Sequence, residues 1–184
     1  MADKPVEIVP GEDLEESLLW IEEMAKGYQA QYGGCAQCVL LPIQRKFNLP
    51  GGTAVIKSAG YFGLGIARLG DMCGALSGAI MALGLASGRE SLKDPAYPEP
   101  TVLDENTGLP KSLVTIREFY KEWVKTFGGH RCQDVQKKLV GQSYDLGDNK
   151  EFKMFKERTN ELCPETVAKT ARMAAEVILK LPRR

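Results

Sequence analysis

Residues 71–85 read DMCGALSGAIMALGL, a run of small and apolar residues with a cysteine near its start. The run predicts a helix over 72–86 that Asp71 can cap, because aspartate is a favoured residue type at helix N-termini. Gly74 and Gly78 lie four positions apart and therefore on one face of this helix. Small residues on one face let another backbone approach closely, so the run predicts a tight helix–helix contact.

Helical periodicity continues on both sides of this run. Longer helical patterns cover about 14–32, 35–47, 113–127, 131–140 and 164–178, and shorter runs cover 53–58 and 150–159. Pro42 lies inside the second pattern and predicts a kink or a shorter helix there. No period-two alternation and no internal repeat are visible. We therefore expect an all-α, single-domain helical bundle of about six to seven helices over residues 1–184.

Two segments lack helical periodicity. Residues 1–12 contain no apolar stretch of the kind found in a secretory signal and are expected to form a flexible N-terminus. Residues 88–110 contain four prolines and are expected to form one long loop. Loops of that length are uncommon in small domains, so this one is expected to act as a lid or an interface arm, or to be mobile.

Charge and composition exclude several kinds of function. The chain of 184 residues has 24 basic and 24 acidic side chains, which gives no support for nucleic-acid binding. A single histidine, His130, excludes a three-histidine zinc site and an HExxH protease. No stretch approaches 18 uncharged apolar residues, so no membrane insertion is expected. The chain is expected to be soluble and cytoplasmic, where thiols stay reduced.

Cysteine positions are the most informative feature of the sequence. Four of the five cysteines fall at predicted helix N-termini, where free N–H groups and the helix dipole favour anions. These four are Cys35, Cys73, Cys132 and Cys163. Such positions lower the pKa of a thiol and favour the thiolate that binds metals or attacks disulfides. Cys38 lies one turn after Cys35 and is best explained by packing.

Several known cysteine sites do not fit. The CxxC of Cys35 and Cys38 lacks the histidine of a haem c attachment site, a βαβ context and a second CxxC. Cysteines that bind metal from four separate helix ends would fit an iron–sulfur cluster or a tetrahedral zinc ion. His130, two residues before Cys132, would extend a mixed site or couple a proton to an electron, but a solvated loop histidine explains it better.

The order of these motifs resembles a known family. Gly34-Cys35-Ala36-Gln37, the CGALSG of residues 73–78 and single cysteines at 132 and 163 are similar to the redox-active proteins with a C…CGAxxG…C…C signature. The resemblance spans about residues 32–179. The pattern also resembles the non-haem domain of split-Soret cytochrome c, in which four cysteines hold a [2Fe–2S] cluster.

The resemblance implies a mostly helical domain with an iron–sulfur cluster, [2Fe–2S] being favoured, bound by Cys35, Cys73, Cys132 and Cys163. Gly74 and Gly78 would let the helix of Cys73 come close to a neighbour or to the cluster. Cys38 is an additional thiol that could replace Cys35 as a ligand, and the 88–110 loop has no counterpart that the resemblance explains. No haem-attachment motif is present, so a cytochrome function does not follow.

The leading hypothesis is therefore a redox protein for electron transfer or redox sensing with a partner protein, rather than an enzyme with its own substrate. No catalytic residue is assigned. One alternative is a thiol–disulfide oxidoreductase that uses Cys35, Cys38 and Cys73. The other is an interaction module with a structural four-cysteine zinc site. Small-residue helix faces and the proline-rich loop also suggest a homodimer.

Overall fold

The fold was analysed in a computed structural model, which describes residues 13–94 and 103–181. The described residues contain eight α-helices, one short 3-10 helix and no strand, which confirms the all-α prediction. The helices are α1 (Leu14–Tyr32), α2 (Cys35–Lys46), α3 (Gly52–Ser58), η1 (Gly60–Phe62), α4 (Gly74–Ser87), α5 (Lys111–Phe127), α6 (Cys132–Val140), α7 (Asn149–Thr159) and α8 (Leu162–Ile178). None of these helices is long and apolar enough to cross a membrane.

Most expected boundaries agree with these helices to within about two residues, but some details differ. The count of eight α-helices exceeds the expected six to seven, because the short α3 and α7 both form. Helix α2 continues through Pro42 to Lys46, so a shorter helix was a wrong expectation. Pro42 is buried in the core, where packing holds the helix across the missing N–H donor. The expected flexible N-terminus at 1–12 and positions 95–102 of the expected loop lie outside the described residues.

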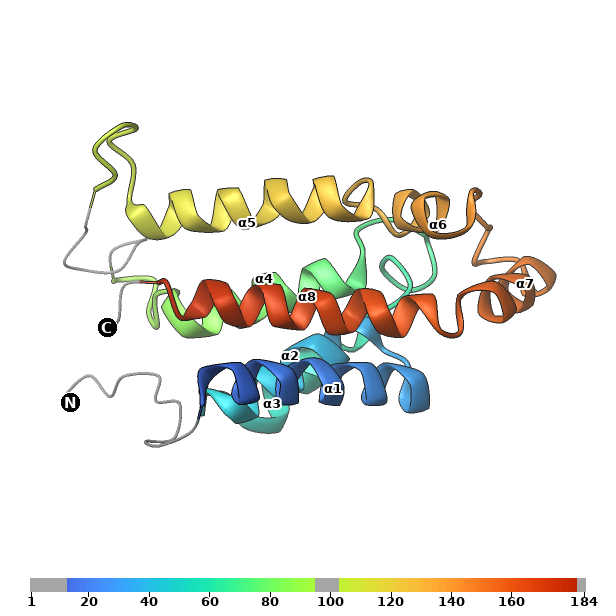
Figure 1. The fold of residues 1–184 in the computed structure, drawn as a ribbon, viewed down its shortest axis with the longest axis horizontal. Helices are drawn as coiled ribbons and strands as arrows, with labels where there is room; N and C mark the ends of the chain where they lie inside the picture. Colours follow the sequence, from blue (N-terminus) through green and yellow to red (C-terminus); the bar gives the residue numbers. More distant parts are fainter. Residues whose placement is uncertain (1–12, 95–102, 182–184) are drawn as a thin grey trace.

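Helices α1 and α8 lie side by side and run in opposite directions (Figure 1). Asp13 caps α1 as predicted, its side chain accepting the backbone N–H of Glu15 at 3.0 Å. The apolar stripes of the two helices are buried at Leu18, Ile21 and Ala25 in α1 and at Val167, Ala171, Ala174 and Ile178 in α8. Arg172 of α8 also pairs with two carboxylates of α1, Glu15 at 2.8 Å and Glu22 at 3.5 Å.

Helices α2 and α4 approach each other through the two glycines of the opening run. A Cβ added to Gly78 would meet the carbonyl oxygen of Ala36 and lie 2.8 Å from its Cα. A Cβ on Gly74 would lie 2.7 Å from the carbonyl oxygen of Phe62 and 3.1 Å from the Cβ of Cys35. The predicted close approach is therefore confirmed, and it places the start of α4 directly beside the start of α2.

Helix α5 covers the other side of α8. Trp123 is fully buried, and its indole N–H donates to the hydroxyl of Thr170 at 2.9 Å. The bundle has one end, on the right in Figure 1, where α2, α4 and α8 all begin. Helices α6 and α7 lie at this same end and close it (Figure 1). The N-termini that carry the cysteines are thus gathered at one end of the fold.

The contact at Gly78 leads to a stability prediction with an internal control. Gly78→Ala should destabilise the protein by roughly 1–3 kcal/mol, because the new methyl group has to push α4 away from the backbone of α2. Gly84 lies in the same helix, and a Cβ there would meet nothing within 4 Å. Gly84→Ala should therefore be neutral or stabilise by up to about 1 kcal/mol. Urea unfolding measures both, and equal effects of the two substitutions would contradict the close contact.

Candidate functional site

A cavity of about 410 Å³ lies at the end of the bundle where the cysteine-bearing helices begin. Its wall includes four cysteines, namely Cys35, Cys73, Cys132 and Cys163. The structure therefore brings together the four thiols that were singled out from the sequence. Cys38 does not belong to this wall. All five cysteines are free thiols.

Each of the four thiols lies at or near a helix start. Cys35 and Cys132 are the first residues of α2 and α6, and Cys73 is the N-cap residue of α4. Cys163 was expected at an N-cap position, but it is the second residue of α8, whose N-cap is Glu161. The difference arises because α8 begins before Pro164, which occupies the first turn where a proline costs no hydrogen bond.

A backbone pairing ties two of these helix starts together. Met72 and Arg131 form an isolated antiparallel β-bridge. The N–H of Cys73 donates to the carbonyl of His130 at 2.9 Å, and the N–H of Cys132 donates to the carbonyl of Asp71 at 2.6 Å. Each cysteine directly follows a bridged residue, so the pairing fixes Cys73 and Cys132 at the same level of the cavity.

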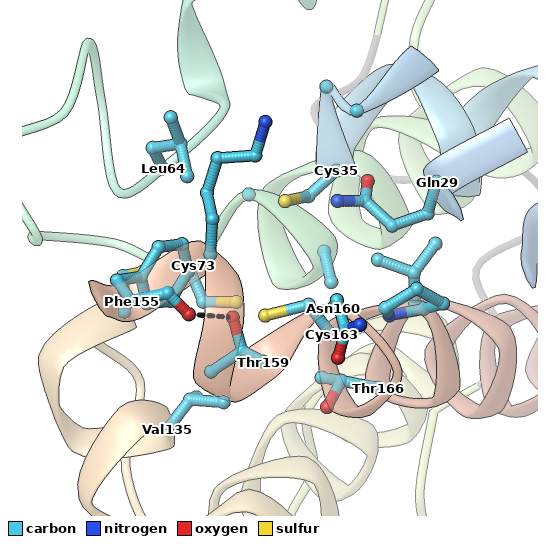
Figure 2. A pocket seen from close by; sticks show the side chains of 18 of the residues that line it. Gln29, Cys35, Leu64, Cys73, Val135, Phe155, Thr159, Asn160, Cys163 and Thr166 are labelled. Atoms are coloured by element: carbon cyan, nitrogen blue, oxygen red, sulfur yellow. Dashed lines mark hydrogen bonds between the residues drawn. The ribbon is translucent and has the colours of Figure 1, made fainter. Parts of the chain in front are cut away.

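Two glutamine side chains lie against the thiols. Gln136 follows Cys132 by one helical turn and donates from Nε2 to Cys132 Sγ at 3.4 Å. Gln29 of α1 lies next to Cys35 (Figure 2), and this contact favours the thiolate of Cys35. Thr159 lies beside Cys163 in the same view, with its hydroxyl bound to the carbonyl of Phe155 at 2.8 Å. The thiols therefore face amide and hydroxyl groups rather than carboxylates.

The cavity wall carries very little charge, and that charge is positive. Among the described residues that form the wall, Lys156 alone has a side chain that is charged at neutral pH, and none is an aspartate or a glutamate. The rest of the wall is mostly apolar or amide-bearing, including Leu64, Val135 and Phe155. The cavity wall therefore places one positive charge and no negative charge near the four thiols.

Burial controls the ionisation of the thiols. Desolvation raises the pKa of Cys132 to about 11 and the pKa of Cys163 to about 12, and it raises the pKa of Cys35 and Cys73 as well. Backbone N–H donors lower the pKa of Cys35 and Cys73 but do not offset this effect. The expectation that helix N-termini leave these thiols with a lowered pKa is therefore wrong. The metal-free site holds neutral thiols at pH 7.

The same pKa values show that the thiols influence one another. Ionisation of Cys35 raises the pKa of Cys73, Cys132 and Cys163, because their like charges repel across the cavity. Cys38 is buried, its pKa is raised to about 12, and its Sγ donates to the carbonyl of Gly33 at 2.9 Å. Cys38 thus packs in the core, as expected.

His130 does not contribute its imidazole to the cavity wall. Its side chain is exposed, and its backbone carbonyl instead accepts the N–H of Cys73. This position agrees with the interpretation of His130 as a solvated loop residue.

One feature of the site has no signal in the sequence. Five consecutive residues, 64–68, have φ between 49° and 71°, including the β-branched Ile66. Such a left-handed turn is costly for non-glycine residues and persists only where its surroundings hold it. Leu64 lies on the cavity wall, while Arg68 donates from Nε to the carbonyl of Leu146 at 2.6 Å and lies 3.7 Å over the Phe152 ring. The turn thus connects α4 with the segment that carries α7.

The side-chain positions do not form a compact single-ion site. Within 13–94 and 103–181, no group of three or more histidine, cysteine, aspartate or glutamate side chains is arranged to hold one metal ion. The four thiols share one cavity without surrounding a single point.

Comparison with known proteins gives one match. A family described as "Putative redox-active protein (C_GCAxxG_C_C)" matches residues 34–177, which is more than half of the chain. The chain belongs to the C_GCAxxG_C_C family. No curated protein and no solved structure matches.

The family match covers all four cysteines of the cavity and ends inside α8. It confirms the resemblance that the cysteine pattern indicated and the description as a redox-active family. The signature in the family's name contains GCAxxG, whereas this chain has the sequence CGALSG over Cys73–Gly78. In this C_GCAxxG_C_C protein the two glycines of that hexapeptide are the ones that contact α2 and the adjoining loop.

The raised thiol pKa values predict how the metal-free protein reacts. Alkylation by iodoacetamide requires thiolate, so labelling at pH 7 should be slow and should rise steadily from pH 7 to beyond pH 9. The rate of labelling rises with pH because each folded thiol has a raised pKa. Each thiol therefore stays protonated until the pH exceeds 9.0, the ordinary pKa of a cysteine thiol. The protein unfolded in urea supplies the control, with ordinary thiol reactivity. Rapid labelling that is already constant between pH 7 and 9 would contradict burial as the dominant effect.

Proposed function

We propose that this protein is a one-electron carrier or redox sensor that binds an iron–sulfur cluster, with [2Fe–2S] favoured, through Cys35, Cys73, Cys132 and Cys163. The observation that carries the proposal is the convergence of these four thiols on one cavity without a carboxylate on its wall. Thiolates are the ligands that iron–sulfur clusters and zinc prefer. The family's description as redox-active favours iron over zinc.

The number of thiols on the cavity wall is the number that a [2Fe–2S] cluster requires. A structural zinc ion needs four donors around a single point, and no such group is formed by the described residues. A [2Fe–2S] cluster takes two thiolates at each iron, so its four ligands are spread over a larger group. Four separate helix starts, those of α2, α4, α6 and α8, supply the four thiols.

The protein's own residues would serve the bound cluster in three ways. The thiols lose their protons on metal binding, which makes the affinity rise with pH. Backbone N–H groups at the helix starts and the side chain of Gln136 donate to the sulfurs, and Lys156 offsets part of the negative charge. The apolar wall limits the access of water. A cluster held by these thiols would supply one-electron transfer between a reduced and an oxidised partner protein.

The structure gives less support to a thiol–disulfide oxidoreductase. Such enzymes depend on a thiol of lowered pKa, whereas burial raises the pKa of Cys35, Cys38 and Cys73. This function remains an outcome that thiol counting would reveal, as a defined disulfide in oxidised, metal-free protein.

The cluster can be tested by metal analysis of protein purified without oxygen. Wild-type protein should contain about two iron ions and two acid-labile sulfides per chain and should be coloured. Alanine in place of any one of Cys35, Cys73, Cys132 or Cys163 should remove most of the iron. Cys38→Ala is the matched control, because Cys38 is buried in the same region but lies outside the cavity wall. It should retain the full iron content.

Circular dichroism separates the loss of ligands from misfolding, and serine variants provide a second, milder substitution. Stoichiometric zinc without iron in wild-type protein would favour the zinc module. Colourless wild-type protein with neither metal would contradict the proposal.

We also propose that the protein forms a homodimer. Gly74 and Gly78 pack against α2 and its neighbouring loop within the same chain, so their faces are occupied. The proline-rich segment 88–110 is then the feature that suggests a dimer. Light scattering should give twice the mass of one chain, and a monomer mass at micromolar concentration would contradict a dimer.

A further inference from the structure

Gln136 is the polar side chain of the cavity wall with the most closely defined contacts. Its side chain is nearly completely buried, with 2 % of the residue exposed. Its Nε2 donates to Cys132 Sγ at 3.4 Å, and its Oε1 accepts the backbone N–H of Tyr144 at 2.8 Å. Both ends of the carboxamide are therefore engaged, one by a thiol and one by the main chain.

The contact with Tyr144 decides which end of the carboxamide faces the thiol. A backbone N–H is always a donor, so the end that meets Tyr144 has to be the oxygen. The NH₂ group is then the end that faces Cys132. Rotation by 180° would place a donor against the N–H of Tyr144 and leave two buried donors unpaired, which is costly. The N–H donor toward Cys132 is therefore fixed by the fold.

The surroundings of Gln136 hold this arrangement in place. Gln136 lies one turn after Cys132 in α6, and the N–H of Cys132 is itself bound to the carbonyl of Asp71. Tyr144 is buried, and its ring packs against Phe155 at 6.3 Å between ring centroids. The carboxamide is thus held by Tyr144 and the main chain of Cys132 by Asp71, both of which lie outside α6.

We propose that Gln136 is a positioning residue that raises the reduction potential of the group bound at Cys132. The inference rests on the proposed iron–sulfur function. An N–H donor to a ligand sulfur stabilises the additional negative charge of the reduced state more than the charge of the oxidised state. Because the donor is already oriented before any electron arrives, no rearrangement is needed on reduction.

Gln29 differs from Gln136 in this respect. It lies beside Cys35, but its Oε1 is buried and has no hydrogen-bond partner among the described residues. Nothing therefore fixes the Gln29 carboxamide from its far end. Gln136 is therefore the better candidate for an N–H donor whose orientation the fold fixes.

The test compares two buried glutamines. Gln136→Met removes the donor while keeping the size of the side chain. Gln44→Met is the matched control, because Gln44 is 6 % exposed and donates at 2.9 Å to the carbonyl of Pro50, away from the cavity wall. The reduction potential of each anaerobic holoprotein is measured by spectroscopic titration. Urea unfolding of each metal-free protein gives a second measurement that does not depend on the cluster.

Both methionine variants should lose stability in the metal-free state, because each removes the hydrogen bonds of a buried carboxamide. Only Gln136→Met should shift the potential, to a more negative value. The expected shift is about tenfold in the ratio of reduced to oxidised protein, or about 59 mV for a one-electron couple. Gln136→Glu keeps an acceptor for Tyr144 but adds negative charge, so its potential should fall at least as far.

The outcomes separate the inference from the function on which it rests. Wild-type protein that binds no iron contradicts the proposed function. Wild-type protein with a cluster whose potential is the same as that of Gln136→Met overturns the role of Gln136. A shift seen only for Gln136→Glu would also overturn it, because the added charge alone would then explain the change. Equal shifts for Gln136→Met and Gln44→Met would indicate general destabilisation and contradict a specific donor.

Discussion

The contact between the backbones of α4 and α2 is the constraint on which the rest of the site depends. Gly78 meets Ala36 with no room for a side chain, and Gly74 meets Cys35 and the loop that follows η1. This contact fixes the start of α4, and with it Cys73, beside the start of α2, which carries Cys35. The bridge between Met72 and Arg131 then attaches the start of α6 to the same place. One small-residue helix face thus locates three of the four thiols.

The resulting cavity balances two opposing effects on its thiols. Helix starts provide N–H donors, but burial has the larger effect and keeps the metal-free thiols protonated. If a metal displaced these protons, the mostly apolar wall and the fixed N–H groups would act on thiolates rather than on neutral thiols. The raised pKa values thus oppose thiol chemistry at neutral pH. Lys156 and Gln136 are the wall residues that would act on the charge of a group bound to the thiols.

Local pattern was sufficient to predict the helices and the cysteine positions at their starts. Asp13, the glycine pair of α4 and the apolar stripes of α1 and α8 are short-range signals with direct physical meaning. The pKa values could not be predicted in this way, because desolvation depends on how far six helices enclose the cavity. The left-handed turn at 64–68 depends on a contact with Leu146, which is far away in the sequence. The orientation of Gln136 depends on Tyr144, which lies in the segment after α6.

X-ray absorption at the iron edge of anaerobically isolated protein tests the central claim most directly, because it reports the ligand atoms themselves. Ligation by the four cavity thiols and bridging sulfides predicts a shell of sulfur alone around iron, with one iron–iron scattering path. The cavity wall includes four cysteines, but it does not include His130. Nitrogen or oxygen in the ligand shell, or iron without a second iron nearby, would contradict a two-iron cluster held by Cys35, Cys73, Cys132 and Cys163.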